Sequence, residues 1–159
     1  MSDFQLLLVA GTHGNEINAP LLMDRWKSEL SIINEYGLRI VQEIGNPRAL
    51  VAMKRYIDQD LNRSFQIGLS KSSDNCLYEV DRANELLSKY GLKGQDPCQI
   101  AIDLHTTTSS MGSSLVVYGR RPADLALASL IQYRLGLPVY LHENDAKQTG
   151  FLVEAWPCG

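Results

Sequence analysis

Two short segments of the 159-residue chain combine residue types that bind a catalytic metal ion. The first, GTHGNE at residues 11–16, places His13 and Glu16 three positions apart, so at a helix start they share one face. The second, at residues 99–105, ends in Asp103-Leu104-His105. Two imidazoles and one carboxylate form a three-ligand zinc set, and its open fourth position is what hydrolytic chemistry on water requires. His13, Glu16 and His105 are therefore our candidate ligands for one Zn²⁺ per chain.

Each of these residues also has an ordinary interpretation. A single histidine in a loop is more often solvated, or satisfied within the core, than a ligand. The spacing of His13 and Glu16 becomes informative because His105 also follows a strand. His142 follows another apolar run, but only Glu143 accompanies it, so we interpret it as structural.

Apolar runs predict the strands that deliver these side chains. Residues 4–10 and 99–105 are typical of buried strands, and α/β sheets bind ligands at the carboxyl ends of such strands. Further strands are expected at 38–44, 114–118, 138–142 and 150–154. Helices are expected from Asn15 or Asn18 to about residue 36, and at 78–90 and 122–135.

The segments between these elements lack clear periodicity. Asn46-Pro47 predicts a turn, residues 49–65 a long loop with short helical pieces, and residues 66–75 a surface connection. The alternation of strands and helices predicts an α/β fold, in which residues 1–159 form one domain with a mixed, mostly parallel sheet flanked by helices.

Composition excludes several function classes. The net charge of −3 argues against a nucleic-acid partner, and no stretch reaches the roughly 18 apolar residues of a membrane span. The first residues do not have the pattern of a signal peptide. Cys76, Cys98 and Cys158 form no CxxC pair, which favours a reducing, cytoplasmic location over a disulfide framework.

The run RYIDQDLNRSF at residues 55–65 has the composition of a carboxylate-binding segment. A guanidinium binds a carboxylate in a bidentate fork, and a neighbouring asparagine adds a neutral donor. The alternative is a surface charge cluster with partial ion pairing, which is the commoner fate of such a run.

Five segments, in this order, resemble the aspartoacylase and succinylglutamate desuccinylase family of zinc carboxypeptidase-like hydrolases. They are GTHGNE, NPRA, RYIDQDLNRSF, LYEVDRANEL and IDLHTTTSSMG. The resemblance extends from about residue 6 to residue 154 and is closer to aspartoacylase than to the desuccinylase branch.

The resemblance implies a role for each site residue. His13, Glu16 and His105 would bind zinc, and Asp60 would accept a hydrogen bond from His13 and fix its tautomer. Arg55 would stabilise the oxyanion that forms on the scissile carbonyl.

The remaining roles concern the substrate and its protons. By the same resemblance, Asn62 and Arg63 would hold the α-carboxylate of an N-acyl amino acid. Glu154 would act as the general acid and base. Aspartoacylases place an arginine shortly before this glutamate; residues 142–149 contain none, and Lys147 is the candidate substitute, as a point charge without the fork.

The resemblance also implies a second, mostly β domain after the catalytic one, whereas this sequence stops at residue 159. We therefore expect a catalytic domain truncated at its C-terminus, an open site, and surfaces that favour self-association into a homo-oligomer. The favoured activity is cleavage of N-acetyl-L-aspartate to acetate and aspartate. The alternatives are a peptide-cleaving zinc carboxypeptidase and an inactive metal-binding fragment.

Overall fold

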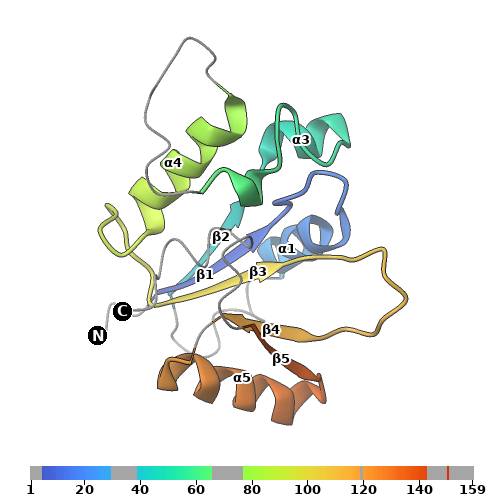
Figure 1. The fold of residues 1–159 in the computed structure, drawn as a ribbon, viewed down its shortest axis with the longest axis vertical. Coiled ribbons are helices and arrows are strands. Elements are labelled where there is room, and N and C mark those ends of the chain that lie inside the picture. Colours follow the sequence, from blue (N-terminus) through green and yellow to red (C-terminus); the bar gives the residue numbers. More distant parts are fainter. Residues whose placement is uncertain (1–4, 30–38, 66–76, 119, 143–149, 151–159) are drawn as a thin grey trace. The chain divides into compact units, whose positions relative to one another are not determined.

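The computed structural model describes residues 5–29, 39–65, 77–118, 120–142 and 150 (Figure 1). These residues fall into two compact units. The first unit contains the described residues up to Thr106 together with Gly150, and the second contains those from Thr107 to His142. That residues 1–159 form one domain stays a prediction.

The sheet of the first unit has three parallel strands in the order β2-β1-β3 (Figure 1). They are β1 (Gln5–Ala10), β2 (Arg39–Ile44) and β3 (Ile100–Leu104). Ala10, the last residue of β1, pairs with Ile44 and Leu104, so all three strands end at one level. The loops that follow β1 and β3 therefore start side by side.

The central strand β1 carries apolar side chains to both faces of the sheet, because successive residues of a strand point in opposite directions. Leu7 and Val9 pack against Leu86 and Tyr90 of helix α4 (Tyr78–Tyr90). On the other face, the core cluster comprises Leu8, Ala10, Ala19 and Met23, the last two from helix α1 (Asn18–Ser28). This layered arrangement confirms the predicted α/β fold with parallel strands flanked by helices.

Most predicted elements of the first unit lie where the sequence placed them, with three differences. Helix α1 ends at Ser28, well before the expected end near residue 36. It begins at Asn18 after Ile17, which makes no side-chain cap, so neither Asn15 nor Asn18 caps this helix. Asn46-Pro47 starts a helix instead of a turn: the Asn46 side chain accepts a hydrogen bond from Ala49 N at 3.0 Å, and Pro47 begins α3 (Pro47–Ala52). The other short helical piece is the 3₁₀ helix η1 (Leu61–Arg63).

The second unit is a strand-helix-strand arrangement. β4 (Leu115–Tyr118) and β5 (Val139–His142) pair in parallel, and α5 (Pro122–Leu135) connects them, as predicted. His142 stacks on Tyr118 with ring centroids 5.3 Å apart, so this histidine has a packing partner inside its own unit. The strand expected at 150–154 and the connection at 66–75 lie outside the described residues.

The structure also bears on the expectations about membrane spans and cysteines. Among the described residues, no helix is long and apolar enough to cross a membrane. Cys98 is a buried free thiol, and burial raises its pKa to about 11. Cys76 and Cys158 lie outside the described residues.

Arg82 joins helix α4 to the carboxyl end of β2. The Arg82 side chain is 7% exposed; it donates to the carbonyls of Gly45 at 2.9 Å and Ile44 at 2.7 Å, and to Glu43 Oε1 at 2.6 Å. Glu43 also accepts a hydrogen bond from the Tyr90 hydroxyl. The end of β2, where the chain turns toward α3, is therefore held by one buried cation.

We expect Arg82→Met to lower the free energy of unfolding by about 3 kcal/mol, because it removes the cation paired with the partly buried Glu43 carboxylate and a donor to two carbonyls. Arg25→Met is the matched control: Arg25 is 72% exposed and pairs with Glu29, so its loss should change stability by less than about 0.5 kcal/mol. Urea unfolding followed by circular dichroism measures both. Equal effects of the two substitutions would contradict the role of Arg82.

Candidate metal centre

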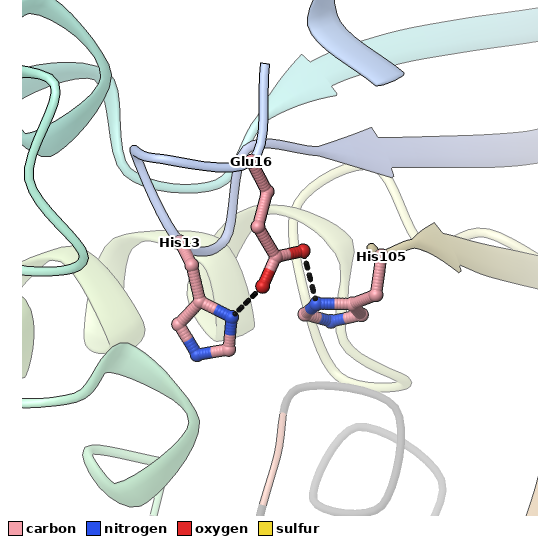
Figure 2. Close-up of side chains that lie close together, drawn as sticks. All are labelled: His13, Glu16 and His105. Carbon is pink, nitrogen blue, oxygen red and sulfur yellow. Dashed lines mark hydrogen bonds and ion pairs between the residues drawn. The ribbon is translucent and has the colours of Figure 1, made fainter. Parts of the chain in front are cut away.

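Three candidate ligands meet at the carboxyl edge of the sheet. His13, Glu16 and His105 each offer a ligand atom, and these atoms lie within 4.8 Å of one another. The Glu16 carboxylate lies between the rings (Figure 2): Oε1 is 2.7 Å from Nδ1 of His13, and Oε2 is 3.2 Å from Nδ1 of His105. The two ring centroids are 5.1 Å apart. Residues from loops that follow two neighbouring strands therefore converge on one point.

Glycines on both sides of His13 allow this convergence. Gly11 has a φ of +65°, a left-handed conformation that turns the chain out of β1. At Gly14 there is no room for a side chain, since a Cβ would lie 2.0 Å from the carbonyl carbon of Ala49 in α3. The Gly14 N–H also donates to the carbonyl of Arg55 at 3.2 Å. The His13 loop is thus pressed against α3 and the segment that follows it.

Each imidazole is backed by a second carboxylate. His13 Nε2 lies 3.2 Å from Asp60 Oδ1, and His105 Nε2 lies 2.8 Å from Asp103 Oδ2. Both rings therefore turn Nδ1 toward Glu16 and Nε2 toward an aspartate. Such outer carboxylates orient a metal-binding histidine and fix its tautomer.

Asp60 occupies the position that the family resemblance implies for it, whereas the role of Asp103 was not anticipated. The Thr12 hydroxyl donates to Asp103, at 3.1 Å from each carboxylate oxygen. Asp103 stands two residues before His105 at the end of a strand, and residues i and i+2 of a strand share a face. That spacing is the signal that could have identified it.

The contacts within the cluster shift the pKa values of Glu16, Asp60, His13 and His105. Burial favours the neutral form of Glu16, but hydrogen bonds with His105, His13 and the Thr106 N–H (2.7 Å) outweigh burial and hold its pKa well below the ordinary value. Burial likewise opposes charge on Asp60, yet its hydrogen bond with His13 lowers its pKa to about 2. Both carboxylates therefore stay ionised at neutral pH.

The histidines shift in the opposite direction. Burial lowers the pKa of His105, but the hydrogen bonds to Asp103 and Glu16 more than offset it and raise the pKa to about 10. The pKa of His13 is also raised, because Asp60 and Glu16 outweigh its burial. Without a metal, His105 therefore holds a proton at neutral pH where a dication would bind.

The donor set fits a divalent ion such as zinc. Its two nitrogens and one carboxylate leave one tetrahedral position for water or substrate. The side chains of His13 and Glu16 are nearly buried, whereas that of His105 is 34% exposed, so one side of the centre is open.

Three of the five other predicted site residues, Arg55, Asn62 and Arg63, lie in described segments. Arg55 Nη2 is 3.2 Å from Asp60 Oδ2, and its Nη1 is 3.8 Å from Glu16 Oε1, so this half-exposed arginine borders the centre. Asn62 and Arg63 belong to η1, directly after Asp60, whose Oδ1 accepts a hydrogen bond from Asn62 N at 2.9 Å. Lys147 and Glu154 lie outside the described residues.

Comparison with known proteins agrees with this geometry. A family model described as the succinylglutamate desuccinylase/aspartoacylase catalytic domain matches residues 2–159. The chain belongs to this family. A curated relative named probable aspartoacylase, from Prochlorococcus marinus, is 65% identical over 159 residues, covering 100% of this chain and 52% of the relative. This succinylglutamate desuccinylase/aspartoacylase chain thus spans about half the length of the curated relatives it matches.

Solved structures support the same family fold. Murine aminoacylase 3, in a mutant form, superposes with a TM-score of 0.77 at 27% identity over 97% of this chain and 52% of that protein. Succinylglutamate desuccinylase from Vibrio cholerae has a TM-score of 0.67 at 20% identity over 93% and 44%, a likeness that bears on the fold alone. The sequence resemblance to the aspartoacylase and succinylglutamate desuccinylase family is confirmed.

We expect Gly14→Ala to weaken Zn²⁺ binding at least about tenfold, because the new methyl group must displace α3 or the loop that carries His13. Gly112→Ala is the control, since a Cβ at Gly112 meets no other described atom within 4 Å. Competition with a chelator measures both affinities. Gly14→Ala with unchanged affinity would contradict the close packing of this loop.

Zn²⁺ binding should release protons, because a metal-binding imidazole must be neutral. Because the pKa values of both histidines are raised, affinity should rise by about two decades per pH unit near pH 6, and because the pKa of His105 is about 10, it should still rise by at least about one decade per unit near pH 8.5. Calorimetry in buffers of different ionisation enthalpy counts the protons. A flat affinity above about pH 7 would mean that the histidines titrate near their ordinary value.

Proposed function

We propose that the chain carries the catalytic centre of a zinc-dependent hydrolase that cleaves the amide bond of an N-acyl amino acid, with N-acetyl-L-aspartate as the favoured substrate. The observation that carries this proposal is the His13–Glu16–His105 cluster, in which Asp60 and Asp103 back the two rings. The names of the relatives, probable aspartoacylase and aminoacylase 3, support the substrate class.

In this proposal, three residues hold the ion and two orient them. His13, Glu16 and His105 supply the donors, while Asp60 and Asp103 accept from Nε2 and leave Nδ1 of each neutral ring as the ligand atom. When bound, zinc lowers the pKa of a water to about 7 and polarises a carbonyl. An amide is a poor electrophile at neutral pH, so both effects are needed for hydrolysis.

Arg55 is the proposed stabiliser of the charge that develops on the amide oxygen. Asp60 holds one end of its guanidinium, and half of the Arg55 side chain faces solvent, where a substrate can reach it. A preorganised cation at that position acts without rearrangement during the reaction, which is why such groups contribute strongly to catalysis.

The proposed substrate contacts are Asn62 and Arg63 for the α-carboxylate and Lys147 for the side-chain carboxylate of aspartate. Glu154 is the proposed general base and acid: it would take a proton from the attacking water and deliver it to the leaving amine. The proposed partner is therefore a small, doubly anionic N-acyl amino acid.

A substrate panel tests this function. The zinc-loaded chain is mixed with N-acetyl-L-aspartate, N-acetyl-L-alanine, N-succinyl-L-glutamate and unmodified peptides, and free amine is measured. We expect kcat/KM to be at least about tenfold higher for N-acetyl-L-aspartate than for N-acetyl-L-alanine, because the second carboxylate gains a charged contact. Glu154→Gln should keep zinc affinity and lose about 10²–10⁴ in kcat.

Three results would overturn the proposal in different ways. Release of C-terminal residues from peptides would identify a zinc carboxypeptidase. A preference for N-succinyl-L-glutamate would identify a desuccinylase. Bound zinc without amine release from any compound would identify a metal-binding fragment without turnover.

A further inference from the structure

Glu79 is a fully buried carboxylate outside the metal centre. It lies in the first turn of α4 and is 0% exposed. Oε1 accepts hydrogen bonds from Ile57 N at 2.7 Å and Asn46 Nδ2 at 3.0 Å, and Oε2 accepts from Asp58 N at 3.0 Å and Gln59 N at 3.2 Å. Burial opposes its charge, but these four bonds outweigh burial and lower its pKa, so Glu79 stays ionised.

The segment that Glu79 binds connects two residues of the site. Residues 57–59 lie between Arg55 and Asp60, and three successive amides of this segment point at one carboxylate. Asp58 returns the interaction, since its Oδ2 accepts a hydrogen bond from Tyr78 N, the first residue of α4, at 2.8 Å. The helix start and the segment therefore hold each other in place.

This junction leads directly to the metal centre. Asp60 follows the bound segment and lies 3.2 Å from His13 Nε2. Arg55 precedes the segment; its carbonyl accepts the Gly14 N–H, and its guanidinium contacts Asp60. A shift of residues 57–59 would therefore move Asp60 away from the imidazole that it orients.

We infer that Glu79 is a positioning residue of the metal centre: by holding residues 57–59, it sets Asp60 against His13 before the ion binds. Its effect on Zn²⁺ affinity passes through Asp60. Any effect of Glu79 on catalysis, through the position of Arg55, rests on the proposed function, whereas its effect on metal binding does not.

Glutamate suits this role because all of its acceptor capacity is used. An ionised carboxylate accepts on both oxygens, and here it faces four N–H donors. In Glu79→Gln one oxygen becomes an NH₂ group that opposes at least one backbone N–H, so that part of the junction must open. Glu85 offers a matched control on the same helix, since it is 62% exposed and pairs with Arg82 at the surface side of the helix.

A double-mutant cycle on the full chain tests the inference with Zn²⁺ alone as the probe. We expect Glu79→Gln and Asp60→Asn each to weaken Zn²⁺ binding by about tenfold, and the double variant to bind no more than about threefold weaker than Asp60→Asn. Glu85→Gln should bind Zn²⁺ within about twofold of the parent chain. The Co²⁺-loaded Glu79→Gln chain should also show altered visible absorption bands, a change at the ligands that a loss of stability alone does not produce.

Two results would overturn the inference. One is an unchanged Zn²⁺ affinity in Glu79→Gln. The other is that Glu79→Gln weakens Zn²⁺ binding as much in the Asp60→Asn variant as it does in the parent chain. Circular dichroism of the metal-free variants verifies that they fold. If Glu79→Gln does not fold, Glu79→Asp, which keeps the charge but is one methylene shorter, replaces it in the cycle. Absence of turnover in the parent chain would count against the proposed function alone, because the cycle reads metal affinity.

Discussion

The Glu16 carboxylate between two imidazoles is the interaction on which the rest of the site depends. It brings together the loops after β1 and β3, which start side by side because the two parallel strands end at one level. Buried charge is costly unless it is paired, and here each ring is paired on both nitrogens while Glu16 also accepts the Thr106 N–H. The same contacts that stabilise the metal-free cluster orient the donors for a dication.

Buried and partly buried carboxylates hold several parts of the first unit in place. Glu16 is a candidate ligand, and Asp60 and Asp103 accept from the two rings. Glu79 contacts neither ring; it accepts hydrogen bonds from the Asn46 side chain and from backbone amides of the segment that leads to Asp60. Glu43 differs, because it pairs with the buried cation Arg82 and closes the end of β2. Glu16, Asp60, Glu79 and Glu43 each have charged or N–H partners that lower the pKa of the carboxyl group, which explains how a small unit carries so much negative charge near its core.

Much of the predicted fold was readable from the sequence, and the reason is local periodicity. The apolar run of β1 and the spacing in α4 report burial within a few residues, so α4 (Tyr78–Tyr90) lies where the pattern placed it. Helix α5 (Pro122–Leu135) also lies at its predicted position, although Ala128 is its one buried residue. The turn predicted at Asn46-Pro47 is wrong, because the same pair of residues also starts a helix when the asparagine side chain caps the first turn. Only the backbone that follows decides between the two.

The sequence by itself located most of the described strands and helices, though not α3, and it identified the candidate ligands His13, Glu16 and His105, because residue type and short-range spacing express both burial and metal chemistry. The tertiary structure alone assigned Glu79 to residues 57–59 and Arg82 to the end of β2, whereas Asp103 and His105 stand two residues apart in the sequence. For Glu79 and Arg82 the physical reason is distance along the chain. The partners of these two residues in residues 57–59 and at the end of β2 lie 20 to 39 residues away, so no local pattern encodes the contacts, and they exist only once the sheet and α4 have packed.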